Sequence, residues 1–150
     1  MLQTLLADRF KLILHYEKKE VSVFALTVGK KEPKVHVSEG DGVSTMQFER
    51  NGVLSFQHTT MAELTDRLFL MNGRPVLDKT RLTGPFDFRV SLDYSSASPQ
   101  QYMAALIGEG EQVPSLLAMI QEQLGFKLEA QNAAIDVLVV DHAERVPTEN

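Results

Sequence analysis

Apolar positions along the chain repeat in three units, each an amphipathic helix followed by two apolar strands. The units cover residues 1–28, 53–92 and 114–142. The first and third align without a gap, since Phe10-Lys11-Leu12 matches Phe126-Lys127-Leu128. Such a unit exposes an apolar face until neighbouring units cover it. The pattern therefore predicts a single α+β domain over residues 1–150, with mostly antiparallel sheets and helices on one face.

The first and third units are each expected to contain two strands. In the first, Lys11–Tyr16 and Val21–Val28 flank a polar turn at Glu17–Glu20. In the third, the strands are Phe126–Leu128 and Ile135–Val140. Because Val21–Val28 is apolar on both faces, we expect it to occupy a central position in its sheet.

A hairpin is predicted in the middle of the chain. Its strands are Val43–Phe48 and Val53–Gln57, and Asn51-Gly52 between them tolerates the positive φ that a tight turn requires. Before it lies a polar loop, in which Val35–Val37 is expected to form a short strand. These strands precede the helix of the second unit.

The second unit carries two further local patterns. Thr60 and Glu63 have the spacing of a capping box, which predicts the start of a helix at this point. Residues Phe86–Leu92 alternate between apolar and polar, which predicts a half-buried strand. On that strand Asp87 and Arg89 are expected to face solvent.

Composition excludes several classes of protein. The chain has 150 residues, 15 Lys and Arg against 20 Asp and Glu, and a net charge of −5. This balance argues against nucleic acid as a partner, because phosphate contacts require clustered cations. No run approaches the ~18 apolar residues of a membrane span, so we expect no direct membrane insertion. The absence of cysteine excludes disulfides and thiolate ligands.

Catalytic and cofactor motifs are not found. The four histidines, His15, His36, His58 and His142, have no spacing typical of a helical metal site. Asp141 adjoins His142, but neighbouring side chains on a strand point to opposite faces, so this pair is not expected to act as a dyad. There is no nucleophile elbow and no phosphate-binding loop. We therefore expect no enzyme activity, no catalytic residue, no metal and no cofactor.

The best candidate for a recognition surface is a polar elbow between Gly73 and Gly84. Asp78 and Thr80 are expected to hold its turn by bonding nearby main-chain amides. The candidate binding residues are its exposed polar side chains, Arg74, Asp78, Lys79 and Arg81.

Three strings carry a resemblance to a known family. They are Leu-Leu-Ala-Asp-Arg-Phe-Lys-Leu at 5–12, Gly-Arg-Pro-Val-Leu-Asp-Lys-Thr-x-Leu-Thr-Gly-x-x-Asp-Phe at 73–88, and Gln-Glu-Gln-Leu-Gly-Phe-Lys-Leu-Glu at 121–129. Together they resemble a soil-associated, mainly acidobacterial protein family of unknown function. The family usually has glycine where this chain has Arg81, which implies a strained elbow here if that position requires positive φ.

The resemblance also implies a location. Members of that family typically carry an export signal and an additional N-terminal region, so this chain is expected to be the C-terminal part of a longer exported protein, periplasmic or secreted. A weaker, fold-level likeness links residues 54–71 and the strands after them to the short N-terminal domain of secretins and TonB-dependent receptors, which contacts other envelope proteins.

These observations lead to one expected function and two alternatives. The expected function is a non-catalytic interaction or ligand-binding module of the bacterial cell envelope, with another envelope protein as partner. Such a module could use the elbow or an open strand edge, and a homodimer through such an edge is compatible with the pattern. The alternatives are a hydrolase with a cryptic active site and an accessory or sensory domain of a larger envelope protein.

Overall fold

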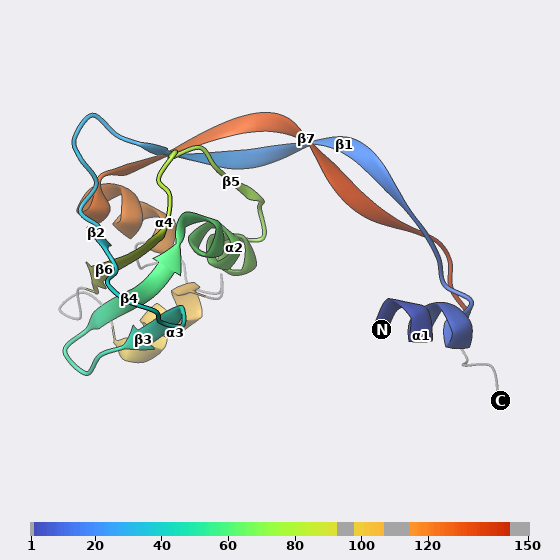
Figure 1. Ribbon diagram of the computed structural model, residues 1–150, viewed down its shortest axis with the longest axis horizontal. Coiled ribbons are helices and arrows are strands. Elements are labelled where there is room, and N and C mark those ends of the chain that lie inside the picture. The colour runs from blue at the N-terminus through green and yellow to red at the C-terminus, as the bar shows by residue number, and fades with distance from the viewer. Residues whose placement is uncertain (1, 93–97, 107–114, 145–150) are drawn as a thin grey trace. The chain divides into compact units, whose positions relative to one another are not determined.

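The structure, a computed structural model, describes residues 2–92, 98–106 and 115–144 (Figure 1). The chain forms two compact units. The first combines residues 1–21 with residues 132–150, and the second is the continuous segment of residues 22–131. Strands β1 (Ile13–Val28) and β7 (Phe126–His142) run through both units, so each unit is described by itself.

The second unit contains a four-stranded antiparallel sheet in the order β2-β6-β4-β3. Its strands are β2 (His36–Val37), β3 (Thr45–Phe48), β4 (Val53–Thr60) and β6 (Pro85–Ser91). The hairpin of β3 and β4 is confirmed, and Gly52 in its turn has φ +79°. The alternation expected in β6 is also confirmed, because Phe86, Phe88 and Val90 are buried while Arg89 is exposed.

A second sheet has the order β5-β1-β7. Strand β5 (Val76–Asp78) runs parallel to β1, with Phe24 opposite Val76 and Leu26 opposite Asp78. The expected central place of Val21–Val28 is therefore confirmed, since β1 has a neighbour on each side.

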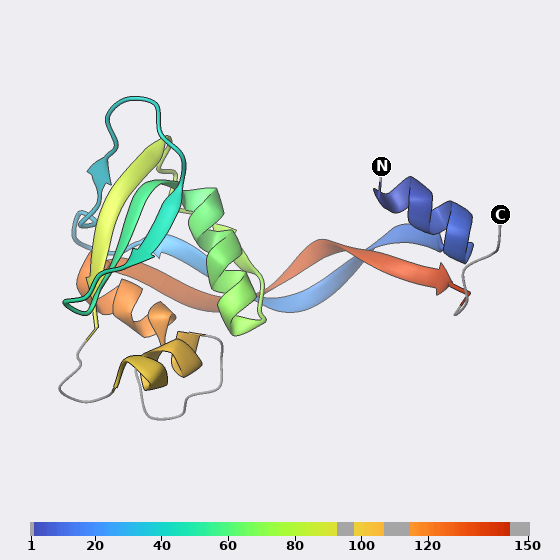
Figure 2. The same cartoon turned by 90° about the horizontal axis from the view of Figure 1, so that it is seen from below.

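Capping residues that are recognisable in the sequence mark both ends of the main helix of the second unit. Helix α2 (Met61–Asn72) has the predicted capping box between Thr60 and Glu63, and it ends at Gly73 with φ +70°. It lies alongside the four-stranded sheet (Figure 2). Helix α3 spans Pro99–Leu106, and α4 (Leu116–Met119) continues into the π-helix η1 (Ile120–Leu124). No helix in the described part of the chain is long and apolar enough to cross a membrane.

The hydrophobic core of the described residues lies in the second unit. It joins α2, α4 and η1 to the inner side chains of both sheets, and Phe56 and Phe88 stack with ring centroids 4.6 Å apart. Its most completely buried apolar members are Leu26, Leu54, Phe56, Met61, Leu64, Leu68, Val90, Tyr102 and Ile120. Burial of a side chain of this size stabilises a fold by about 1.5–3 kcal/mol.

The first unit contains α1 (Leu2–Phe10), Ile13–Val21 of β1 and Asn132–His142 of β7. The main-chain N–H of Glu144 donates to the carbonyl of Phe10 at 2.8 Å, and Lys11 forms an ion pair with Glu144 at 3.3 Å. None of the side chains described in this unit is fully buried.

The α+β fold class with largely antiparallel sheets is confirmed, but the division of two units into paired short strands is wrong. Residues Glu17–Glu20 are not a turn, because β1 is continuous from Ile13 to Val28, and β7 is likewise continuous. The segment lacks the Gly, Pro, Asn or Asp that would hold a turn. Its four charged side chains are all exposed, so an extended strand accommodates them without burying charge.

Candidate ligand-binding site

The site begins with a β-bulge between β4 and β6. Phe56 is opposite Phe88 and Thr59 is opposite Phe86, so two residues of β4 face the single residue Asp87. The second bulge residue, His58, has φ +52°. A bulge removes an amide from the hydrogen-bond ladder, and that amide then requires another acceptor.

Asp87 provides that acceptor. Its Oδ1 accepts a hydrogen bond from the main-chain N–H of His58 at 2.8 Å and another from the hydroxyl of Ser38. These two donors, the Ser38 hydroxyl first, lower the pKa of Asp87 below its ordinary value, and partial burial opposes them only in part. Asp87 is therefore an ionised carboxylate with two hydrogen-bond donors, on the outer face of β6 where the alternation placed it, and it is half-buried there.

A close approach of the loop before β3 fixes the bulge from the other side. The N–H of Gly42 donates to Nε2 of His58 at 3.2 Å. A Cβ at Gly42 would lie 2.9 Å from Nδ1 of His58, which is closer than real Cβ contacts. Glycine at position 42 thus allows the loop to pack against the His58 ring.

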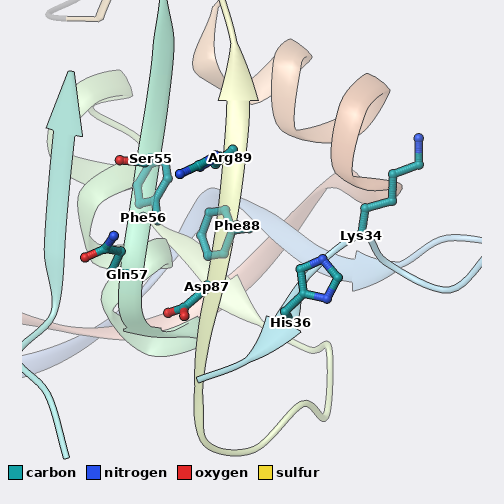
Figure 3. Close-up of a pocket in the computed structure, with 8 residues that line it drawn as sticks. All are labelled: Lys34, His36, Ser55, Phe56, Gln57, Asp87, Phe88 and Arg89. Carbon is teal, nitrogen blue, oxygen red and sulfur yellow. The ribbon is translucent and has the colours of Figure 1, made fainter. Parts of the chain in front are cut away.

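A pocket of about 480 Å³ lies over β6 beside this bulge. Figure 3 shows β6 in the middle, with residues of β4 on one side and residues of β2 and the segment before it on the other. Its lining residues are Lys34, His36, Ser55, Phe56, Gln57, Asp87, Phe88 and Arg89. The volume is within the roughly 300–1,000 Å³ of small-molecule sites, but the lining is mostly polar, which favours a polar ligand.

The outer edge of β6 is partly open at this pocket. Odd-numbered residues present their main-chain groups to this edge: Asp87 pairs with His36 of β2, and Ser91 bonds the side-chain amide of Gln123 through both its N–H (2.7 Å) and its carbonyl (2.8 Å). Arg89 lies between them and presents its groups in the same direction. In the described part of the chain no strand pairs with Arg89 here.

The preceding loop explains this gap. An extension of β2 would bring Lys34 opposite Arg89, but the N–H of Lys34 donates instead to the carbonyl of Leu124 at 2.9 Å. The next amide, of Val35, donates to Pro33 at 2.9 Å. The chain before His36 therefore turns away from β6, and the pocket occupies the space that a longer β2 would fill.

Among the charged lining residues the cations Lys34 and Arg89 outnumber the carboxylate Asp87. Lys34, His36 and Arg89 contribute donors, and Asp87 is the single carboxylate among the lining residues. Arg89 forms one ion pair, with Glu49 at 3.5 Å, and its side chain is 69% exposed. An exposed pair of this kind contributes little free energy, so Arg89 remains available to a ligand.

The elbow predicted from the sequence is present and is held as expected. Oδ1 of Asp78 accepts from the N–H and the hydroxyl of Thr80 at 2.9 and 2.7 Å, and the Thr80 hydroxyl accepts from the N–H of Leu82 at 3.1 Å. Arg81 has φ +61°, the conformation that favours glycine. The strain implied by an arginine at this position is therefore confirmed.

The four candidate elbow residues lie at two ends of β5. Arg74 precedes the strand, and its guanidinium carbon lies 4.8 Å from the centroid of the Phe24 ring. Asp78, the last residue of β5, Lys79 and Arg81 are at the other end, and all are exposed. The structure therefore groups three of the four. No described contact joins Arg74 to the others, and their role in binding stays a prediction.

The histidines do not form a metal site within the described residues, where no group of three or more His, Asp or Glu could hold an ion. Asp141 contacts His15 instead of its neighbour His142. Nδ1 of His15 lies 2.6 Å from Oδ2 of Asp141, and Nε2 lies 2.8 Å from Oε1 of Glu17. These two contacts raise the pKa of His15, the Asp141 contact most.

Sequence reasoning did not find the pocket. It placed Asp87 and Arg89 on the outer face of a strand. Two charged residues on the same face of one strand are the one local signal that could have indicated the site. Apart from Phe88 of the same strand, the other lining residues come from a loop and from two further strands, β2 and β4. Their contribution depends on pairing between distant segments, which no local pattern encodes.

The fold and the site together define an α+β protein with a polar, charged pocket at an open strand edge. The chain belongs to a family described as protein of unknown function (DUF3738), whose model matches residues 1–143. No curated protein and no solved structure matches the chain.

Proposed function

We propose that this protein is a non-catalytic binding module of the bacterial cell envelope and that its ligand binds in the pocket over β6. One observation carries the proposal: the pocket lies at Arg89, which pairs with Ser55 of β4 on one side but has no strand partner among the described residues on the outer edge of β6. An open edge offers a donor and an acceptor from the main chain, and the surrounding side chains supply specificity.

Electrostatics favours binding over catalysis at this site. A general acid or base works best when its pKa is near the working pH, and an acid at neutral pH needs a raised pKa. The pKa of Asp87 is instead lowered, and Oδ1 already accepts two hydrogen bonds. Asp87 is therefore suited to holding the bulge and the pocket wall.

A hydrolase remains the second candidate, because His36 is opposite Asp87 across the β2–β6 pair. An assay of peptide and ester hydrolysis distinguishes the two functions. We expect no turnover above that of a His36→Gln variant. Turnover that depends on both His36 and Asp87 would replace the binding proposal with the hydrolase.

The experiment that tests binding is capture from an envelope extract of the source bacterium, followed by mass spectrometry. We expect the intact protein to retain a defined partner or small ligand and an Arg89→Gln variant to lose it. Arg50→Gln is the matched control, since Arg50 is an exposed arginine outside the pocket. Equal retention by all three proteins would contradict the assignment of the pocket.

The envelope location and the elbow are part of the same proposal. Support comes from the resemblance to a family with export signals and from the fold-level likeness to a module of envelope receptors. Fractionation of the bacterium, probed with an antibody, tests the location. A double variant, Lys79→Ala with Arg81→Ala, tests whether the elbow contacts a protein partner, and sedimentation at several concentrations tests for a homodimer.

A further inference from the structure

The open edge of β6 is bounded at both ends. On one side β2 pairs with Asp87, and on the other the Gln123 side chain pairs with Ser91. Neighbouring residues that face one edge are two positions apart, so Arg89 alone is accessible between these barriers. A strand that passes along the edge would have to displace β2 or Gln123, whereas the end of a chain could pair with Arg89 without displacing either.

The charge of the pocket selects which end of a chain fits. Lys34 and Arg89 are cationic, and His36 adds a donor. The carboxylate of Asp87 already accepts two hydrogen bonds through Oδ1. A terminal ammonium group would meet the cations Lys34 and Arg89, and the two nearby carboxylates are already engaged, Asp87 by two donors and Glu49 by Arg89. A terminal carboxylate would gain charge-assisted hydrogen bonds from the same cations. Arginine suits this role because its planar group binds a carboxylate through two parallel N–H donors.

From these two constraints we propose that the pocket binds the C-terminal carboxylate of an extended peptide. The last residue of the peptide pairs with the main chain of Arg89, and its carboxylate is held by Lys34. The side chain of Arg89 points toward β4 and pairs with Glu49 in the free protein, so it joins Lys34 on the carboxylate by leaving this exposed pair (Figure 3). Asp87, Gln57 and Ser55 line the wall that the last side chain passes (Figure 3). This inference rests on the proposed function and specifies its ligand class.

The test compares four probes on the intact protein at low ionic strength. They are N-acetyl-trialanine with a free carboxylate, the same peptide as a C-terminal amide, sodium acetate and inorganic phosphate. Affinity is measured by titration of ¹⁵N-labelled protein, in which the amide of Arg89 reports main-chain pairing directly. We expect the free acid to bind at least about tenfold more tightly than the amide and to move the Arg89 amide resonance.

Charge-removing variants assign the contact to the pocket. Lys34→Gln and Arg89→Gln should each lower the affinity for the free-acid peptide by roughly tenfold, so that this affinity approaches that of the amide peptide. Lys31→Gln and Arg50→Gln remove the same charges from exposed positions outside the pocket and should leave the affinity within about twofold. Thermal unfolding of each variant identifies any loss of affinity that comes from misfolding.

Three outcomes overturn the inference. Equal binding of acid and amide peptides would exclude recognition of the carboxylate, while the pocket would still be a binding site. Phosphate or acetate binding as tightly as the acid peptide would indicate a simple oxyanion site. If no probe moves the Arg89 amide, the peptide ligand is excluded, and the capture experiment above then decides separately whether the pocket binds anything.

Discussion

Residues with left-handed backbone conformations are where individual side chains conflict most clearly with the fold. Lys11, His58 and Arg81 have positive φ, which costs a non-glycine residue about 1–2 kcal/mol. The His58 conformation belongs to the bulge, where Asp87 and Gly42 both bind the residue. At Arg81 no described side-chain contact compensates, since Thr80 and Asp78 hold the turn themselves.

Replacement of Arg81 by glycine should therefore stabilise the protein. We expect Arg81→Gly to raise the free energy of unfolding by up to about 1 kcal/mol, the relief of strain less the greater freedom of glycine in the unfolded chain. Arg81→Ala removes the same side chain and keeps the strain, so it should give no gain. Urea denaturation of the three proteins measures the difference, and a stabilised alanine variant would contradict this explanation.

Asp87 should give the protein an acid-sensitive component of stability. Its folded pKa is lowered below the reference value of 3.8, so its contribution is complete above that value and is lost as the pH falls through the folded pKa. We expect unfolding free energy measured against pH to show this loss in the natural protein. An Asp87→Asn variant, which keeps an acceptor oxygen and cannot titrate, should not show it.

Replacement of Asp87 by a residue without an acceptor oxygen should lower the free energy of unfolding more than Asp87→Asn does. Asp87→Ala leaves the part-buried amide of His58 without its partner, and loss of a hydrogen bond of this kind costs about 1 kcal/mol. The asparagine variant should recover most of this loss. Equal destabilisation by alanine and asparagine would indicate that the charge, and not the hydrogen bond to the bulge, is what matters.

At the scale of elements, the pairing of β1 with β7 in the first unit contains a titratable contact. A protonated His15 donates from both ring nitrogens, to Asp141 on the neighbouring strand and to Glu17 on its own strand. Its raised folded pKa means that this contribution is complete below the reference value of 6.5 and is lost as the pH rises through the folded pKa.

We therefore expect the ring resonances of His15 to titrate with a midpoint above 6.5. Asp141→Asn removes the stronger of the two contacts and should move the midpoint back toward that value. The shift should shrink as salt is added, because all three side chains are at least 40% exposed. A midpoint unchanged by Asp141→Asn would show that the strands do not meet through this pair.

For the whole molecule, the distribution of the core predicts where stability resides. Every buried core residue among those described lies between Ser22 and Gln131. A two-stranded ribbon without a covered apolar face is marginal on its own. The single domain predicted from the sequence stays a prediction, but the second unit has the buried surface that independent folding requires.

A fragment of residues 22–131 should accordingly fold without the first unit. We expect a cooperative thermal transition and amide spectra that match the corresponding residues of the intact protein. The residues of the first unit, joined by a short linker, should remain largely unfolded as a separate peptide. An unfolded fragment 22–131 would mean that the two units stabilise each other and form one cooperative domain.

The sequence by itself determined the features that depend on neighbouring residues. The capping box at Thr60, the hairpin turn at Gly52, the alternation of β6 and the Asp78 turn all follow from side chains that meet within a few positions. The residue positions of α2 and β6 were thus predictable, as was the α+β class.

Only the tertiary structure decided how far β1 and β7 extend and where the pocket lies. Strand length there depends on pairing between segments more than a hundred residues apart, so Glu17–Glu20, a polar segment that interrupts the apolar pattern, is part of β1. The pocket likewise exists because Lys34 bonds Leu124 and leaves the outer edge of β6 at Arg89 without a strand partner. Such main-chain bonds are independent of side-chain type, and for that reason the order of amino acids does not reveal them.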